Sequence, residues 1–260
     1  MAIEVWIAKL QKQQYAASSI RRKLACLRAF FRYMVDQGHL LVSPLRDLCI
    51  RLGAPRRLTR VVPPDEIRAL IQTADQRAAR WKSHRHSSVE RLVILRNALL
   101  VRLFCVTGIR VGELVSLRIA DVQQQERMLL IHGKGNRERI AFVSDPASAT
   151  LLDRYLQARR MCFKDREPLF PNAFGAALST DSTRAILRAL AQAANLSRRI
   201  TPHMLRHTAA TFLLENGADL RIVQEFLGHD SIRSTERYIH VARVHLIRVL
   251  RRANPLKRVA

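Results

Sequence analysis

Four side chains near the carboxyl end of the chain have the types needed for chemistry at a phosphate group. They are His203, Arg206, His229 and Tyr238, set among apolar residues with helical spacing. Guanidinium groups bind phosphate oxygens through paired hydrogen bonds, imidazoles transfer protons near neutral pH, and a phenol can act as a nucleophile. The set therefore predicts chemistry at one phosphate, provided that the fold brings the groups together.

Helix ends that can be predicted from the sequence position the first two groups. Thr201 is a suitable N-cap for a helix whose first residue is Pro202. His203 and Arg206 are three residues apart, so they lie on one face of that helix near its start. Free backbone N–H groups at a helix N-terminus attract anions as well. This helix start is therefore a predicted anion site.

The next predicted helix positions the third group. Asp219 can cap this helix and Gly228 ends it, which places His229 directly after its last turn. Tyr238 follows 9 residues later, on a helix predicted from Ile232 to the low 240s.

Taken singly, these residues have plainer interpretations. A lone histidine is more often a surface or core residue, a tyrosine usually packs, and a turn lysine such as Lys134 is usually solvated. His203, His207 and His229 also suggest zinc, but no carboxylate or cysteine completes a familiar spacing. We therefore expect neither a metal nor a cofactor.

The overall charge favours a polyanionic partner. The 260 residues include 45 Lys and Arg against 21 Asp and Glu, a formal net charge of +24. The basic residues are spread along the chain, which favours a folded binding surface over a disordered arm. A basic protein without a specific partner is the alternative.

Other features indicate the setting. No run of about 18 apolar residues and no signal peptide is present, so neither a membrane span nor export is predicted. The four cysteines are far apart and form no Cys-x-x-Cys pair: Cys26, Cys49, Cys105 and Cys162. This pattern predicts neither a zinc site nor disulfides, and it indicates a reducing cytoplasm.

The amino-terminal segment is predicted to be helical. One helix is expected to start at Ser18 or Ser19 as N-cap and to stop at Gly38. Its apolar stripe, predicted to be buried, consists of Ile20, Leu24, Leu27, Phe30, Phe31 and Met34. The other side carries basic residues with no acid among them, which suits a DNA phosphate backbone: Arg21, Arg22, Lys23, Arg28 and Arg32.

The rest of the chain predicts a mainly helical domain with one small antiparallel sheet. Two β-type runs flank Gly133–Asn136, a hairpin turn signature. Residues 75–90 read either as a helix extension or as an exposed basic loop. Further helices are expected over residues 64–74, 90–108, 109–122, 146–160, 180–194, 202–216 and 220–227. The expected organisation is a helical unit at 1–52, a linker at 53–61 and a larger domain at 62–260.

Together, these motifs resemble those of the tyrosine recombinase, or phage integrase, family, and most closely its bacterial Xer-like branch. Four stretches carry the likeness: "TGIRVGELVSL" (107–117), "GKGNRER" (133–139), "HMLRHT" (203–208) and "LGHDSIRSTERYIHV" (227–241). The intervals are also similar, with 23 residues from Arg206 to His229. The resemblance extends through most of residues 60–245.

The resemblance implies an enzyme that cuts and rejoins double-stranded DNA without metal or ATP. Its implied catalytic residues are Arg110, Lys134, His203, Arg206, His229 and the nucleophile Tyr238, which would form a covalent 3′-phosphotyrosine. Glu113 matches an acidic position expected to orient the arginine. His207 is expected to brace Tyr238 or to make a core hydrogen bond.

The resemblance also sets expectations for assembly. Members of this branch carry a core-binding (SAM-like) domain of four or more helices, so residues 1–52 are expected to be a partial DNA-binding domain that lacks the first helices. The apolar stretch 244–250 packs on its own domain or, as in relatives, docks into a neighbouring protomer to form a homo-tetramer on paired sites. We expect this stretch to be exchanged between protomers. We also expect the protein to act in the cytoplasm, associated with the nucleoid. A type IB topoisomerase and a DNA-binding remnant of a mobile element are the alternatives.

Overall fold

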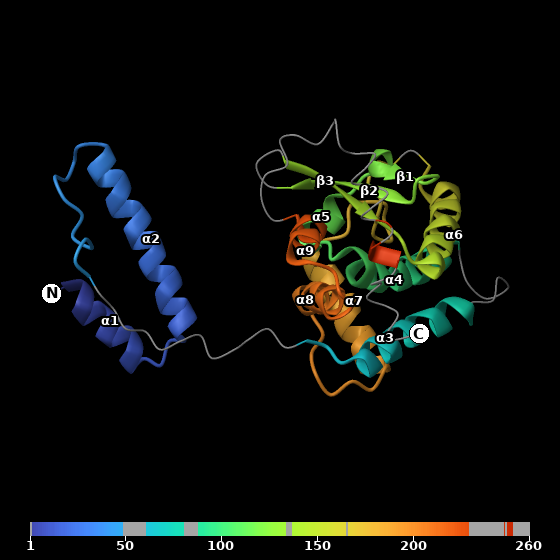
Figure 1. Ribbon diagram of the computed structural model, residues 1–260, viewed down its shortest axis with the longest axis horizontal. Helices are drawn as coiled ribbons and strands as arrows, with labels where there is room; N and C mark the ends of the chain where they lie inside the picture. Colours follow the sequence, from blue (N-terminus) through green and yellow to red (C-terminus); the bar gives the residue numbers. More distant parts are fainter. Residues whose placement is uncertain are drawn as a thin grey trace. The chain divides into compact units, whose positions relative to one another are not determined.

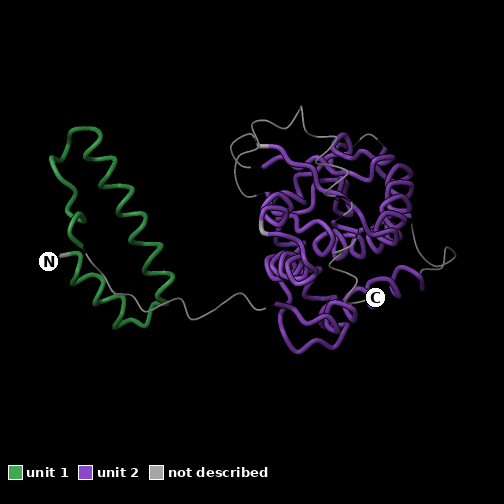
Figure 2. The backbone as a smooth tube through the Cα atoms, viewed as in Figure 1, with its two compact units in different colours: residues 1–58 green, residues 59–260 purple. Residues whose placement is uncertain are grey.

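The computed structural model describes residues 2–48, 61–80, 88–133, 137–164, 166–228, 247 and 249–251. The chain divides into two compact units, Met1–Leu58 and Thr59–Ala260, shown in different colours in Figure 2. The predicted linker at 53–61 spans this division, and all of it except Val61 lies outside the described residues. The roles assigned to the two units stay predictions.

The first unit contains two helices, α1 (Ala2–Lys12) and α2 (Ala17–Asp36). The predicted serine cap of α2 is wrong. Its N-cap is Ala16, whose carbonyl accepts hydrogen bonds from the N–H groups of Ser19 and Ile20, and no side chain caps the helix. The predicted stop is confirmed, because α2 ends before Gly38, which has a φ of +74°.

The predicted apolar stripe of α2 is buried only in its first half. Ile20 and Leu24 pack with Ile7 and Leu10 of α1, whereas Phe30 is 52% exposed. Three more stripe residues are only partly buried: Leu27, Phe31 and Met34. The reason is length, since α1 has 11 residues and α2 has 20, so α1 cannot cover the whole stripe.

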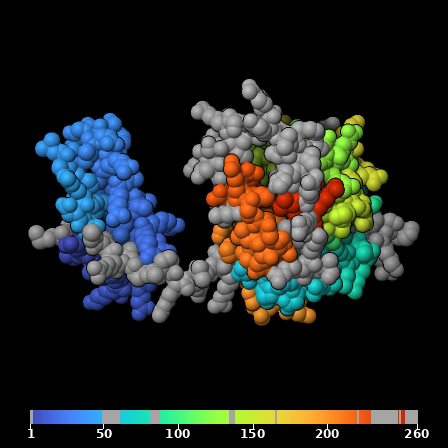
Figure 3. Space-filling view, in the orientation of Figure 1, coloured from blue at the N-terminus to red at the C-terminus, as the bar shows by residue number. Residues whose placement is uncertain are grey.

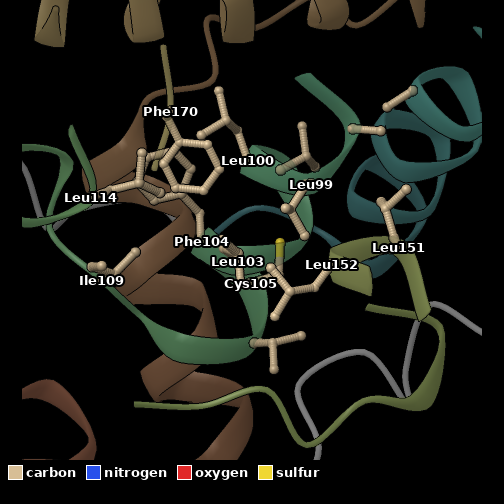
Figure 4. Packing of buried hydrophobic residues seen from close by; sticks show 14 of the residues in the cluster. Leu99, Leu100, Leu103, Phe104, Cys105, Ile109, Leu114, Leu151, Leu152 and Phe170 are labelled. Atoms are coloured by element: carbon tan, nitrogen blue, oxygen red, sulfur yellow. The ribbon is translucent and has the colours of Figure 1, made fainter. Parts of the chain in front are cut away.

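The second unit is built around α4 (Ser88–Thr107), a strongly apolar helix. It packs against α3 (Pro64–Ala79), α6 (Pro146–Cys162) and α8 (Pro202–Glu215), and it lies between α3 and the sheet in Figure 1. In Figure 4 its side chains meet those of Ile109, Leu114, Leu151, Leu152 and Phe170. This core is the platform on which the remaining elements rest.

Helix α3 settles part of the choice left open at residues 75–90. It begins with Pro64 at its first position and runs to Ala79, five residues beyond the predicted end at Ala74. The extension reading therefore holds for 75–79, while 88–90 belong to α4 and 81–87 lie outside the described residues. At the start of this unit, the Val62 N–H donates to Oγ1 of Thr208, which ties this segment to α8.

The hairpin predicted around residues 133–136 is confirmed. The strands β1 (Val122–Gln123), β2 (Met128–Gly133) and β3 (Arg137–Phe142) form an antiparallel sheet in that order. Gly133 is paired with Arg137 at the turn end of the hairpin. The mainly helical fold with a small antiparallel sheet is therefore the predicted one.

The helix predicted over 109–122 is wrong in extent. Only α5 (Val111–Ser116) and a 3₁₀ turn (Ile119–Asp121) form there, followed by β1, which was not predicted. The chain leaves helical geometry at Leu117, whose carbonyl accepts from the Leu169 N–H, while the Ile119 N–H donates to the Glu167 carbonyl. These hydrogen bonds come from a distant segment, so local spacing could not predict them.

The caps of the last helices follow the sequence. Thr201 caps α8 by accepting from the Met204 N–H, and Asp219 caps α9 (Leu220–Leu227) by accepting from the Ile222 N–H. Helix α7 (Thr180–Ala193) starts after Ser179 in the same way. The helix predicted from Ile232 to the low 240s lies outside the described residues. None of the described helices combines the length and the apolar character needed to cross a bilayer.

A second apolar cluster joins the sheet to the last helices. Met128 and Phe142 of the hairpin pack with Leu213 of α8 and Phe226 of α9. Leu250, from the terminal segment, is buried in the same cluster, and Figure 3 shows the described terminal residues in red beside the orange α8–α9 region. Leu250 thus packs on its own chain, with Ile247 and Val249 partly buried against the same cluster, while the exchange of this stretch between chains stays a prediction.

Candidate active site

Arg110 and Glu113 form a closed local pair at the start of α5. Oε1 of Glu113 accepts from Nη1 of Arg110 at 2.6 Å, and Oε2 accepts from the Arg110 backbone N–H at 3.0 Å. The Arg110 side chain is 45% exposed, whereas that of Glu113 is 9% exposed. Glu113 therefore holds one side of the Arg110 guanidinium in place, and the other side is open to solvent.

Arg206 reaches the same region from α8. Its Nη1 donates to the Gly108 carbonyl at 2.5 Å and its Nη2 donates to the Leu227 carbonyl at 2.6 Å. Gly108 precedes Arg110 by two residues, and Leu227 is the last residue of α9. The buried guanidinium of Arg206 thus joins the segment that carries Arg110 to the segment that leads into His229.

A third guanidinium, that of Arg139 on β3, completes what we call the arginine cluster (Arg110, Arg139, Arg206 and Glu113). Its Nη2 donates to Oε2 of Glu113 at 2.7 Å, and its side chain is only 8% exposed. The sequence motifs include Arg139 but give it no role. A signal was present, because alternation along the strand puts Arg139 on the same face as the buried Ala141.

The electrostatics of the arginine cluster show an excess of positive charge. Burial lowers the pKa of Arg206 to about 10, and the nearby Arg110 and Arg139 contribute to that lowering against the opposing effect of Glu113. Burial also lowers the pKa of Arg139, chiefly opposed by Glu113. A pKa near 10 still leaves Arg206 cationic at neutral pH. Three guanidiniums around one carboxylate favour binding of an anion.

Glu113 is ionised despite its burial. Desolvation alone would raise its pKa, but the charge of Arg139 and the hydrogen bonds from Arg110 outweigh that effect and lower it. The carboxylate is therefore a fixed hydrogen-bond acceptor and not a proton donor at neutral pH.

The two described histidines of the predicted site lie on α8 with Arg206. His203 is in the first turn and exposed, one helical turn before Arg206. His207 is partly buried, and its backbone carbonyl accepts from Oγ1 of Thr211. The roles assigned to both stay predictions.

Lys134, His229 and Tyr238 lie outside the described residues. The structure does place the neighbours of the first two. Gly133 ends β2 on the hairpin that carries Arg139, and Gly228 ends α9 with a left-handed φ of +62°. A Cβ atom on Gly228 would overlap Cδ and Nε of Arg139, so the end of α9 lies directly against β3.

The basic residues predicted to contact DNA lie along α2. Arg21 is partly buried. The other four are exposed: Arg22, Lys23, Arg28 and Arg32. The Lys23 ammonium lies 5.5 Å from the centre of the Tyr15 ring, and Arg28 donates to the Leu48 carbonyl at 3.5 Å. Their contact with DNA stays a prediction.

Other chemistry in the described part of the chain is limited. No group of three or more histidines, cysteines and carboxylates there could hold a metal ion. Cys26, Cys105 and Cys162 are free thiols, and Cys49 lies outside the described residues.

Two family models match the chain. The model of the Phage integrase family covers residues 60–245, and the model of the phage integrase N-terminal SAM-like domain covers residues 1–38. The first of these spans more than half of the chain and contains the arginine cluster.

Similar proteins and solved structures agree with this family assignment. A tyrosine recombinase XerC of Lactobacillus delbrueckii subsp. bulgaricus is 34% identical over 249 residues, which is 94% of this chain and 79% of that protein. A tyrosine recombinase XerD of Lacticaseibacillus casei is 33% identical over 253 residues, 95% of this chain and 80% of that protein. The crystal structure of a XerA recombinase, 27% identical, matches 96% of this chain and 81% of its own with a TM-score of 0.57.

A further structure supports the fold alone. It is the XerH site-specific recombinase bound to a palindromic difH substrate, 24% identical, with a TM-score of 0.69 over 94% of this chain and 70% of its own.

The family model and the relatives thus identify the chain as a DNA strand-exchange enzyme of the tyrosine type, and the chain belongs to the phage integrase family. Within that family it is similar to the bacterial Xer proteins, and it is a site-specific recombinase.

Proposed function

We propose that the chain cuts and rejoins double-stranded DNA through Tyr238, with Arg110 and Arg206 holding the scissile phosphate. One observation carries this proposal. Arg206 donates to the carbonyl of Gly108, 98 residues away in the sequence, so its guanidinium lies in a cluster where three cations share one carboxylate. A phosphate diester is an anion that such a cluster would bind.

The proposed step transfers a phosphoryl group without metal or ATP. Tyr238 attacks the phosphorus atom while the bond to the 5′-oxygen breaks, which leaves a 3′-phosphotyrosine. His203 accepts the phenolic proton, Lys134 protonates the departing 5′-oxygen, and His229 donates a hydrogen bond to the phosphate. Because the new ester keeps the energy of the old one, the 5′-hydroxyl of another strand can reverse the step.

The arginines contribute by stabilising charge. A phosphodiester resists attack because its oxygens repel the nucleophile, and the in-line transition state carries additional negative charge. Planar guanidiniums remain cationic and can bind both nonbridging oxygens. The exposed face of Arg110 is suited to this contact, since Glu113 already holds its other side.

The same proposal includes the assembly. Residues on α2 (Arg21, Arg22, Lys23, Arg28 and Arg32) contact the phosphate backbone, and four chains assemble on paired sites by exchanging the terminal segment. A lambda integrase tetramer bound to a Holliday junction is among the structures similar in fold, which supports a ring of four. A DNA substrate places the reaction in the cytoplasm with the nucleoid.

The test is a covalent adduct. The chain is incubated with nicked duplexes drawn from the DNA that flanks its own gene, and protein–DNA adducts are separated in denaturing gels. We expect an adduct with the native chain and none with Tyr238→Phe. Arg110→Ala should form it about 10²–10³ times more slowly, by analogy with the loss of an oxyanion-hole donor. Arg110 is the better arginine to replace because its side chain is half exposed.

Two outcomes would contradict the proposal. If the native chain binds these duplexes without forming any adduct, it is a DNA-binding remnant. If it forms the adduct and relaxes supercoiled plasmid but never exchanges strands between two sites, it acts as a topoisomerase.

A further inference from the structure

We propose that Arg139 is a positioning residue for DNA cleavage, which acts through Glu113 on the guanidinium of Arg110. This inference rests on the proposed function, because it assigns Arg139 a part in the same phosphate site.

The contacts of Glu113 show how the three residues are linked. Its Oε1 accepts from the guanidinium of Arg110 at 2.6 Å, and its Oε2 accepts from the guanidinium of Arg139 at 2.7 Å. Oε2 also accepts from the Arg110 backbone N–H at 3.0 Å. Both carboxylate oxygens are therefore used, so the orientation of the carboxylate, and with it that of Arg110, depends on Arg139.

The charge of Arg139 supports the same link. Glu113 is buried, and desolvation alone would raise its pKa towards the neutral acid. The charge of Arg139 is the largest single effect that opposes this rise, ahead of each contribution from Arg110. Without Arg139, the carboxylate that holds Arg110 would lose its main counter-charge.

Packing fixes Arg139 in this position. Arg139 pairs in register with Ile131, an apolar residue that is 1% exposed, and its own side chain is 8% exposed. On the other side it lies against Gly228, where a Cβ atom would overlap Cδ and Nε of the arginine. Held between Glu113 and the end of α9, the guanidinium has little freedom to move.

One donor of Arg139 argues against a purely structural role. Nη1 is buried and has no hydrogen-bond acceptor among the described residues. Arg159, a buried arginine of the same unit, instead donates to the carbonyls of Phe163, Arg166 and Pro168. A buried cationic N–H without an acceptor is unfavourable, so a residue kept only for stability would be expected to satisfy it.

The experiment compares Arg139→Met with a matched control, Arg102→Met. Arg102 is also largely buried, with a side chain 13% exposed, and it pairs with Asp75 at 2.5 Å and with Asp145 at 3.3 Å, neither of which belongs to the arginine cluster. For both variants we measure the single-turnover rate of adduct formation on the nicked duplex, and the urea midpoint of unfolding. We expect both midpoints to fall, but only Arg139→Met to lose cleavage, by about 10²-fold. Arg139→Lys, which keeps the charge without the fork, should recover part of that loss.

A double-substitution cycle tests whether the effect passes through Glu113. If Arg139 acts by holding that carboxylate, Glu113→Gln combined with Arg139→Met should be no slower than the slower single variant. A substrate with sulfur in place of the bridging 5′-oxygen tests the other route, through the hairpin that carries Lys134. A thiolate leaves without help from an acid, so this substrate should not rescue Arg139→Met.

The outcomes separate this inference from the proposed function. If the native chain forms an adduct and Arg139→Met forms it as fast as Arg102→Met, the inference is overturned while the proposed function stands. Losses that multiply with Glu113→Gln, or rescue by the sulfur substrate, also overturn the link through Glu113. If the native chain forms no adduct at all, both proposals fall.

Discussion

At the scale of single residues, the two proposed phosphate-binding arginines are held in different ways. Arg206 is buried and bonded to two backbone carbonyls, those of Gly108 and Leu227, so it supports the fold as well as the site. Arg110 is half exposed and depends on one carboxylate. Replacing Arg206 would therefore perturb folding and chemistry together, whereas replacing Arg110 reports mainly on chemistry.

The proposed acid, Lys134, gives a sharp prediction at this scale. Lys134→Ala should slow cleavage of ordinary DNA by about 10²–10⁴-fold, the usual contribution of general acid catalysis. A substrate with a bridging 5′-sulfur should restore most of the rate, because a thiol has a far lower pKa than an alcohol. Adduct formation with both substrates is the measurement. Equal losses on oxygen and sulfur substrates would show that Lys134 is not the acid.

At the scale of elements, a close contact at Gly108 joins the end of α4 to α9. Gly108 has a φ of +57°, and a Cβ atom there would lie 2.5 Å from Cε1 of the buried Phe226. Its carbonyl also accepts from Arg206. The turn between α4 and α5 therefore needs glycine for its backbone conformation and for its packing on α9.

Gly108→Ala should lower the free energy of unfolding by about 2–5 kcal/mol, from the left-handed backbone and the overlap with Phe226. Gly112 is a matched control four residues further on, since it lies in α5 and a Cβ atom added there would meet nothing within 4 Å. Gly112→Ala should instead be neutral or stabilising by up to about 1 kcal/mol. Urea unfolding of both variants is the measurement, and equal effects would contradict the argument.

At the turn end of the hairpin, one histidine lies between two carboxylates, an ionisable contact that we call the His132 clasp. His132 on β2 has Nε2 3.0 Å from Oδ1 of Asp121, and Nδ1 3.0 Å from Oε1 of Glu138. A neutral imidazole has only one N–H, so both contacts are satisfied only in the protonated ring. The hydrogen bond to Asp121 is the main cause of a raised pKa of His132.

A raised pKa stabilises the fold below the unfolded value, about 6.5, and this stabilisation is lost as pH rises through the folded value. The stability advantage of the native chain over His132→Gln should therefore shrink as pH rises from below about 6.5 through the raised pKa of His132. His39→Gln is the control, since His39 has no carboxylate partner among the described residues. Urea unfolding across this range is the test, and an advantage that does not change with pH would contradict the clasp.

At the scale of the whole molecule, the packing of the terminal segment (residues 244–250) distinguishes two arrangements. The segment either packs on its own chain or is exchanged with a neighbouring chain. Leu250 is 1% exposed and packs in the cluster with Leu213 of α8 and Phe226 of α9. The proposed tetramer needs this segment to leave its own chain and dock on a neighbour. The same apolar site would then be filled in both states.

Leu250→Ala should lower the free energy of unfolding of the dilute, monomeric chain by about 2–5 kcal/mol, because it leaves a cavity in that cluster. Leu214→Ala is the control, since Leu214 on α8 is 43% exposed and its loss should cost little. Urea unfolding at several protein concentrations is the measurement. If Leu250→Ala costs stability only at concentrations where the chain associates, the segment is held by a neighbour and not by its own chain.

Much of this molecule could be predicted from local sequence. The helix starts at Thr201 and Asp219, the stop at Gly228 and the hairpin around 133–136 were all predicted, because capping and turn formation depend on neighbouring residues. The family followed from spaced motifs. One error arose where a distant segment intervenes, after α5, because Leu117 and Ile119 form hydrogen bonds with residues 167–169.

Only the tertiary structure decided which groups meet. The sequence supplied the guanidiniums of Arg110 and Arg206, but the inclusion of Arg139 depends on the register of β3 and on the close approach of Gly228. In the same way, Phe30 fits the apolar stripe of α2 yet is exposed, because α1 is too short to cover it. Local spacing fixes the face on which a side chain lies, whereas burial and partners depend on what the rest of the chain places against that face.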